Sequence, residues 1–166
     1  MKYIAFVTKG LEQISEEEIK ALNDVTILST KQKIIEFEYI GDIGNLKTFR
    51  TVDDVGIYIS EISTHKLLKL KLDTELGEIR KATDALRQFR DIGKNFSITI
   101  SKYKSKEIKE DDLKQILSEY FSSNLNLSYT PLDHSNLDIR INISEEDCLI
   151  TVKVFSRSLF HRDYEH

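Results

Sequence analysis

The first 62 residues alternate between two spacings of apolar side chains, one typical of strands and one typical of helices. Four short segments rich in β-branched and aromatic residues predict strands. Between them, residues 11–22 carry apolar side chains at the spacing of an amphipathic helix, and a second short helix is expected after the glycines at 41 and 44. The predicted order is strand, helix, strand, strand, helix, strand over residues 3–7, 11–22, 25–28, 33–39, 45–49 and 55–62.

The stretch TKGLEQISEEEI, residues 8–19, joins the first strand to the first helix. Gly10 permits a tight turn there, because glycine adopts backbone conformations that other residues avoid. Leu11, Ile14 and Ile19 are expected to form the buried stripe of the helix. The glutamates at 16–18 would favour the helix start through its dipole.

The second half of the chain shows the same two spacings. Residues 96–100 alternate strictly and predict a half-buried strand, and residues 137–143 and 150–154 predict a hairpin. Helices are expected over residues 76–90, capped by Asp73-Thr74 and ended by Gly93, and over residues 113–121 behind the acidic first turn at 110–112.

These elements predict an α+β protein of two domains. The order of the first six elements is that of a ferredoxin-like fold, with helices on one face of an antiparallel sheet. The regular pattern lapses in HKLLKLKL at residues 65–72. We therefore expect a ferredoxin-like domain over residues 1–65 and a second domain over residues 66–166.

Composition fits this picture of a folded protein. The chain has 166 residues, of which 40% are hydrophobic and 31% charged. Cys148 is the single cysteine, so an intrachain disulfide is excluded and a reducing compartment is expected. Because the chain has neither a run of about 20 apolar residues nor a signal-type amino terminus, we expect a cytoplasmic protein.

The net charge of −4 conceals an uneven distribution. Residues 1–65 carry 7 basic and 11 acidic side chains, a balance of 7 − 11 = −4, whereas residues 66–109 carry 12 basic and 6 acidic ones, a balance of 12 − 6 = +6. An anionic partner is therefore expected to meet the segment 66–109 first.

Familiar catalytic and metal-binding patterns are missing from the sequence. The six glycines form no phosphate-binding loop, and the four histidines lack metal-ligand spacing. Cys148 is interpreted as a structural thiol, because no predicted neighbour supplies a base. Glu36 and Glu38 are interpreted as a solvated strand face. The sequence therefore favours a binding module over an enzyme, and we expect neither a metal nor a cofactor in this chain.

The basic side chains of the second half are candidates for contacts with an RNA backbone. Arginines and lysines lie on the helix 76–90, and lysines surround Tyr103 in the loop after the strand 96–100. If the helix end and the loop lie together, they form one positive surface with an aromatic ring for stacking. The alternative is that these lysines only keep the protein in solution. The candidates from this region are Arg87, Arg90, Lys94, Lys102, Tyr103, Lys104 and Lys106.

The stretch after the first strand resembles the opening of RNA-modifying enzymes of the THUMP family, especially THUMP-containing methyltransferases. Their first strand is followed by a segment like G-L-E-x-(L/I)-(A/S)-x-x-E-(L/I). Residues 10–19 of this chain agree with that segment at every specified position.

A second resemblance lies near the other end. The family finishes its THUMP domain with a tail like S-L-x-(K/R)-R-G-Y-R, and residues 158–165 are similar to it, although Asp163 and Glu165 replace the usual Gly and Arg. Residues 138–141, D-I-R-I, are similar to a strand of the family. The likeness adds Arg140, Arg157, His161 and Arg162 to the residues expected to contact RNA.

The resemblance implies a ferredoxin-like domain followed by an α/β THUMP domain with a carboxyl-terminal linker tail. In that family the two domains together bind tRNA and deliver a nucleotide to a separate catalytic domain, here expected to be that of a guanine-N2 methyltransferase. S-adenosylmethionine is expected in that domain, in cis or in trans. The family's (N/D)-P-P-(Y/F) motif cannot occur in this chain, which has the single proline Pro131.

Two other interpretations stay open from the residues alone. Paired α+β domains also serve as protein-interaction or small-ligand regulatory modules, so the fold class does not decide the function. A complete small enzyme is the third interpretation, and a convergent pocket of titratable groups would support it.

Overall fold

The computed structural model describes residues 1–67, 77–92, 94–102, 109–131 and 135–155. Its contacts form two compact units, Met1–Tyr58 with the described residues from Lys153 onward, and Ile59–Val152. Strand β4, Val52–Ser63, contributes residues to both. Each unit is described by itself below, and the domain boundary expected between residues 65 and 66 stays a prediction.

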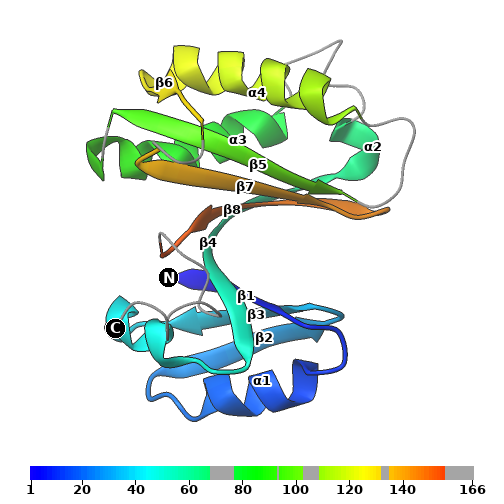
Figure 1. Ribbon diagram of the computed structural model, residues 1–166, viewed down its shortest axis with the longest axis vertical. Helices are drawn as coiled ribbons and strands as arrows, with labels where there is room; N and C mark the ends of the chain where they lie inside the picture. The colour runs from blue at the N-terminus through cyan, green and yellow to red at the C-terminus, as the bar shows by residue number, and fades with distance from the viewer. Residues whose placement is uncertain (68–76, 93, 103–108, 132–134, 156–166) are drawn as a thin grey trace. The chain divides into compact units, whose positions relative to one another are not determined.

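The first unit has the expected ferredoxin-like order (Figure 1). Its strands pair antiparallel in the order β2-β3-β1-β4, and α1 covers one face of this sheet. The second helix of the pattern is a 3-10 helix, labelled η1. The elements before β4 are β1 (Lys2–Val7), α1 (Glu12–Lys20), β2 (Val25–Lys31), β3 (Ile34–Tyr39) and η1 (Ile43–Thr48).

The turn into α1 confirms the role expected for Gly10. Its φ of +97° lies in the left-handed region, which glycine adopts without a steric penalty. The amide of Gly10 donates to the Glu12 carboxylate at 2.6 Å, and the amide of Leu11 donates to the Thr8 carbonyl at 3.0 Å. The chain therefore reverses direction within these few residues.

The buried stripe expected on α1 was partly wrong. Ile19 is fully buried, but Leu11 is 37% and Ile14 is 53% exposed. The buried neighbour of Ile19 is Ser15. The reason is a set of hydrogen bonds to the start of β4: the Ser15 hydroxyl donates to the Thr51 carbonyl at 3.0 Å, and the Glu18 carboxylate accepts from the Thr51 amide at 2.9 Å. These bonds fix the helix with Ile14 facing outward.

The same contacts correct the expectation for the acidic cluster at 16–18. Helix α1 begins at Glu12, so the cluster lies beyond the first turn and is not explained by the helix dipole. Glu18 satisfies backbone amides instead, and Glu16 accepts from Lys20 at 2.7 Å and from the Thr30 hydroxyl at 2.7 Å. The Lys20 ammonium, followed by the Thr30 hydroxyl, lowers the pKa of Glu16.

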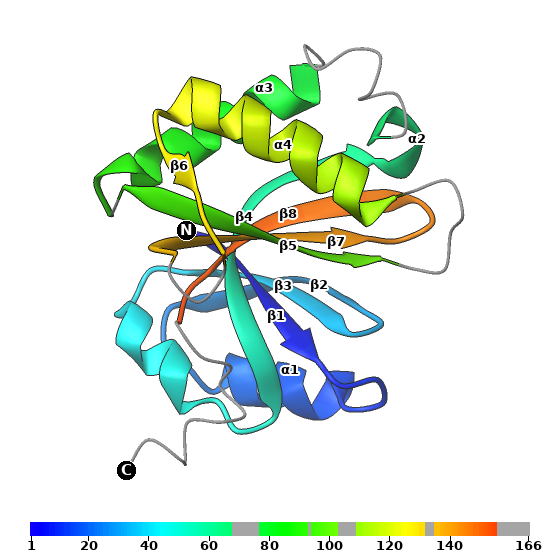
Figure 2. The same cartoon turned by 45° about the horizontal axis from the view of Figure 1, so that its top comes forward.

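In the second unit the described strands are ordered β4-β8-β7-β5-β6 (Figures 1 and 2). Strand β5 is parallel to both β6 and β7, whereas β7 and β8 form the expected antiparallel hairpin. The helix expected over 76–90 divides into an α-helix and a 3-10 helix. The elements are α2 (Thr64–Leu67), α3 (Gly77–Leu86), η2 (Arg87–Ile92), β5 (Asn95–Lys102), α4 (Glu110–Leu125), β6 (Ser128–Tyr129), β7 (Leu137–Ile143) and β8 (Asp147–Lys153).

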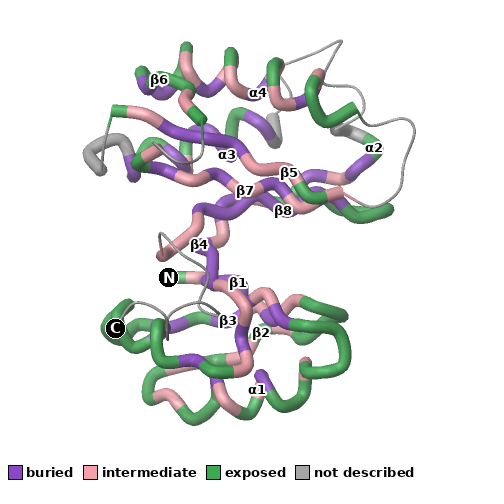
Figure 3. Tube along the Cα trace, viewed as in Figure 1, coloured by how far each residue is buried: buried purple, intermediate pink, exposed green. Residues whose placement is uncertain are grey.

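Helices α3 and α4 cover one face of this sheet, and both views show them on the same side (Figures 1 and 2). The buried side chains of α4 recur every four residues and include Phe121, whose ring meets that of Phe96 edge to face at 6.3 Å. The strict alternation expected over residues 96–100 is interrupted, since Ser97 is buried together with Phe96 and Ile98. Figure 3 shows the buried trace running along the strands and the inner side of α4.

Cys148 confirms the interpretation of a structural thiol. It lies in β8 opposite Ile143 and is fully buried. Burial, with a smaller contribution from the neighbouring Asp147 charge, raises its pKa to about 12. Because the thiolate is the reactive form, this cysteine is chemically inert in the folded protein.

A matched pair of substitutions on α1 tests the packing. Ile19→Ala should lower the free energy of unfolding by about 2–5 kcal/mol, because it removes a fully buried side chain. Ile14→Ala on the same helix should change it by less than about 0.5 kcal/mol, because that side chain is largely in solvent. Urea denaturation followed by circular dichroism measures both. Equal losses would contradict the helix orientation described above.

The inertness of Cys148 is testable with an aromatic disulfide reagent. At about pH 8 the native protein should react far more slowly than the urea-unfolded chain, because a free thiol there is partly ionised and the buried one is not. The raised pKa of Cys148 in the folded protein also makes its stability depend on pH. Burial of the protonated thiol contributes its full stabilisation below about pH 9, and this contribution is lost as the pH rises toward 12. Fast stoichiometric labelling of the native protein would show that the thiol is accessible.

Candidate nucleic-acid interface

The outer surface of α3 carries the first of the expected basic residues. The helix buries Ile79, Ala82 and Leu86, which leaves its opposite side to solvent. Arg87 is exposed at the start of η2, where its guanidinium pairs with the carboxylate of Asp84 one turn earlier. Since exposed pairs of this kind contribute about 1 kcal/mol or less, a phosphate could compete for the guanidinium. The side chain of Arg90 lies outside the described residues.

Strand β5 separates the two groups of lysines that the sequence placed on one surface. Lys94 immediately precedes this strand and Lys102 ends it. An extended strand rises about 3.3 Å per residue, so eight steps put their backbones about 26 Å apart. The helix end and the start of the basic loop therefore lie at opposite ends of β5. The candidates Tyr103, Lys104 and Lys106 lie outside the described residues, and so do Arg157, His161 and Arg162.

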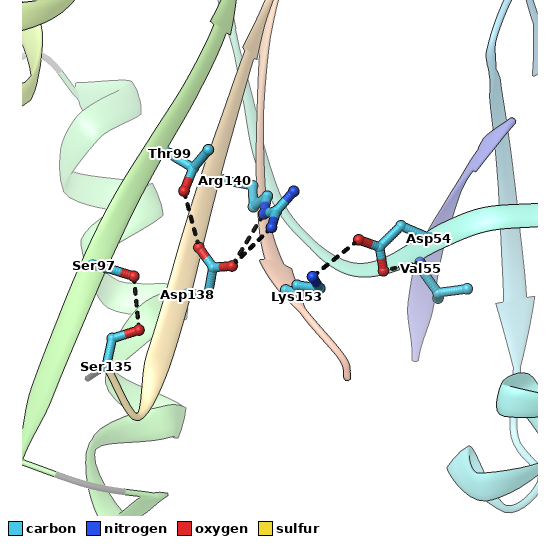
Figure 4. Close-up of polar contacts among 8 residues, drawn as sticks. All are labelled: Asp54, Val55, Ser97, Thr99, Ser135, Asp138, Arg140 and Lys153. Atoms are coloured by element: carbon cyan, nitrogen blue, oxygen red, sulfur yellow. Dashed lines mark hydrogen bonds and ion pairs between the residues drawn. The ribbon is translucent and has the colours of Figure 1, made fainter. Parts of the chain in front are cut away.

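Arg140 lies on the face of the second unit's sheet that α3 and α4 do not cover, in a group of polar side chains (Figure 4). The register pairs Ser97 with Asp138 and Thr99 with Arg140. Because every second side chain of a strand points to the same side, these four side chains share one face of the sheet. The Arg140 guanidinium donates from Nε to Asp138 Oδ2 at 3.1 Å, and its Nη2 lies 3.1 Å from the same oxygen. The other Asp138 oxygen accepts from the Thr99 hydroxyl at 3.4 Å.

This pairing changes the expected role of Arg140. Its side chain is 29% exposed and that of Asp138 is 14% exposed, so the pair is only partly hydrated. A carboxylate at hydrogen-bond distance neutralises much of the guanidinium charge and holds its plane in one orientation. Arg140 is thus better suited to directional hydrogen bonding than to general attraction of phosphate.

The start of β5 forms a further polar group that the sequence did not single out. The Lys94 amide donates to Asn136 Oδ1 at 3.2 Å, and the Asn136 amide donates to Asn95 Oδ1 at 2.6 Å. Beside them, the two-residue strand β6 holds Tyr129, which is 42% exposed. A strand of two residues is too short for its side-chain periodicity to be detected in the sequence. The sequence offered only one clue to this site, namely an aromatic residue between the polar Ser128 and Thr130.

Other charged side chains are accounted for by pairing within the first unit. Lys2 pairs with Glu36 and places its ammonium 4.0 Å from the centre of the Tyr58 ring, so Glu36 is not free to act with Glu38 as an acid and base. Lys153 lies 3.4 Å from the Asp54 carboxylate (Figure 4). Lys2, Glu36, Lys153 and Asp54 are therefore engaged in contacts within the fold.

Neither a metal centre nor a membrane segment is found in the part of the chain that the structure describes. No group of three or more histidine, cysteine, aspartate or glutamate side chains there could hold a metal ion. Helices within the same residues are too short or too polar to cross a bilayer.

Comparison with known proteins gives a fold but no family. No family model matches the chain, and no curated protein matches it. Among solved structures, TrmN from Thermus thermophilus superposes with a TM-score of 0.65 at 12% identity, over 98% of this chain and 48% of that one. SMU.472, a candidate methyltransferase complexed with SAH, has a TM-score of 0.67 at 15% identity, over 99% of this chain and 44% of that one.

A third solved structure is that of a complex with nucleic acid. A 4-thiouridine synthetase in complex with RNA and ATP superposes with a TM-score of 0.58 at 15% identity, over 91% of this chain and 40% of that one. The chain thus spans less than half the length of each of these three proteins. What it shares with them is an α+β fold whose first unit is ferredoxin-like.

Proposed function

We propose that this chain is an RNA-binding module, with tRNA as its substrate class, that presents a nucleotide to a catalytic domain outside these 166 residues. The observation that carries the proposal is the superposition of 91% of the chain on a 4-thiouridine synthetase solved with RNA. The excess of 12 − 6 = +6 charges over residues 66–109 supports it independently, because phosphate binding requires local positive charge.

The geometry of β5 shapes the proposed interface. Lys94 immediately precedes this strand and Arg87 begins the preceding helix η2, whereas Lys102 ends the strand and is followed in sequence by Lys104 and Lys106. The two ends of β5 are about 26 Å apart, which is much more than a single phosphate group can bridge. The RNA would therefore be held at two separate points. The acidic residues 1–65 would orient the RNA by repulsion rather than bind it.

The reaction served is proposed to be methylation of guanine N2 in tRNA. The resemblance of residues 10–19 and 158–165 to THUMP-containing methyltransferases supports this choice. This chain covers less than half the length of two solved proteins with the same fold. One of these is a candidate methyltransferase that was solved with SAH bound. Catalysis and S-adenosylmethionine binding are accordingly assigned to a methyltransferase domain acting in cis or in trans.

Charge reversal at one end of β5 tests the RNA-binding proposal. Changing Lys102, Lys104 and Lys106 together to Glu should lower the affinity for tRNA by roughly tenfold or more, because three cations that neutralise phosphates are lost. The slope of log affinity against log salt should fall by about 3, or about one for each lysine. Gel-shift titration at several salt concentrations measures both quantities, and circular dichroism checks that the fold persists.

A matched control separates a local interface from overall charge. Changing Lys9, Lys31 and Lys47 to Glu alters the net charge equally within residues 1–65, and it should leave the affinity within about twofold. Wild-type protein that does not bind tRNA, or binds it without salt dependence, would contradict the proposed function and favour a protein-interaction or small-ligand module. Equal losses in both triple variants would contradict the location of the interface.

A further inference from the structure

Strand β6 presents an aromatic ring at the edge of the second unit's sheet. Tyr129 pairs with Phe96 in the parallel register of β5 and β6, and its ring centre lies 5.7 Å from that of Phe96. Phe96 is fully buried, but Tyr129 keeps 42% of its surface in solvent. One side of the Tyr129 ring is therefore supported by the core, and another part of it faces water.

The angle between the two rings leaves a stacking surface. Their planes are inclined by 64°, which is an edge-to-face arrangement. If Tyr129 directs its edge at Phe96, then Phe96 covers neither Tyr129 face. If Tyr129 receives the edge of Phe96, then one face stays uncovered by it. In both cases at least one face of Tyr129 is left uncovered by Phe96.

The backbone holds this ring in a fixed position. Helix α4 ends at Asn126, whose φ of 57° turns the chain in the left-handed conformation. Leu127 is buried directly after this turn. The Ser128 amide then donates to the Lys94 carbonyl at 3.0 Å, and the Thr130 amide donates to the Phe96 carbonyl at 2.9 Å. A backbone held on both sides of Tyr129 leaves less conformational entropy to be lost when a ligand binds there.

The backbone of Lys94 lies close to that of Tyr129. Because the Lys94 carbonyl accepts from Ser128, the residue before Tyr129, the backbones of Lys94 and Tyr129 are close neighbours. Lys94 is exposed, and Asn136, also exposed, accepts a hydrogen bond from its amide. These three residues offer complementary groups for one nucleotide. The ring of Tyr129 suits the face of a base, the ammonium of Lys94 suits its phosphate, and the amide side chain of Asn136 suits its polar edge.

We propose that Tyr129 and Lys94 form a binding site for one unpaired nucleotide of the RNA, in which the base stacks on Tyr129 and its phosphate pairs with Lys94. This inference rests on the proposed RNA-binding function and adds to it a preference for single-stranded over double-stranded segments. A paired base has both faces covered by its neighbours in the helix and cannot stack on a side chain.

Two hairpin RNAs test the site in the whole 166-residue chain, one with a short unpaired extension and the same one with a blunt end. Tyr129→Ala should weaken binding of the extended hairpin by about 5- to 150-fold, the range for losing one base-stacking contact. Binding of the blunt hairpin should stay within about twofold of wild type. Tyr129→Phe is the matched control and should retain the wild-type affinity for both hairpins, because the stacking face is kept.

A fluorescence reporter gives a second measurement, because the chain contains no tryptophan. Tyr129→Trp should retain binding, and its fluorescence should be quenched when the extended hairpin is added. The control Tyr120→Trp places the reporter on α4, where its ring contacts Phe121 rather than the proposed ligand, and its signal should change less.

The outcomes separate this inference from the proposed function. If the wild-type protein binds neither hairpin nor tRNA, the proposed function itself fails. If it binds RNA with normal salt dependence but Tyr129→Ala loses nothing, or loses equally with both hairpins, only the stacking site is overturned. Circular dichroism of Tyr129→Ala and Tyr129→Phe checks that both variants stay folded, so that a loss of affinity in Tyr129→Ala does not come from unfolding.

Discussion

The parallel pairing of β5 with β7 is the constraint on which the second unit depends. Parallel neighbours cannot be joined by a tight turn, so the chain must cross over between them, and α4 provides most of that crossover. The helix then buries its apolar side on Phe96 and covers one face of the sheet. Polar side chains of both strands are left on the other face, where Asp138 holds Arg140.

Much of this architecture was predictable because its elements are long and regular. The four-residue spacing of α4 and the strict alternation of β7 each leave one face apolar, and such faces have a single way to be buried. Helix α1 was less predictable at the level of side chains. Its orientation is set by bonds from Ser15 and Glu18 to Thr51, which is 33 or more residues away in sequence, and these bonds outweigh the burial of Ile14.

The candidate site was harder to predict because it depends on strand direction. Lys94 and Lys102 are close in sequence, and only the extended conformation of β5 places them at opposite ends. Tyr129 presents the reverse case, since 33 residues separate it from Phe96 and the parallel register brings them into contact. Asp138 and Arg140 alternate along one strand, so their shared face was visible, but the hydrogen bonds between them were not.

Screening by salt reconciles the proposed RNA binding with the net charge of −4. At physiological ionic strength the field of an exposed charge decays over about 8 Å, roughly a third of the 26 Å between the ends of β5. A phosphate near Lys94 would therefore experience mainly the charges within about 8 Å of it, and those at the far end of β5 would contribute little. In the proposed interface the two ends of β5 would act as nearly independent binding points, whose contributions to the binding free energy should add. An RNA that reaches only one end gains only one contribution, so the length of β5 itself favours RNAs that can span it.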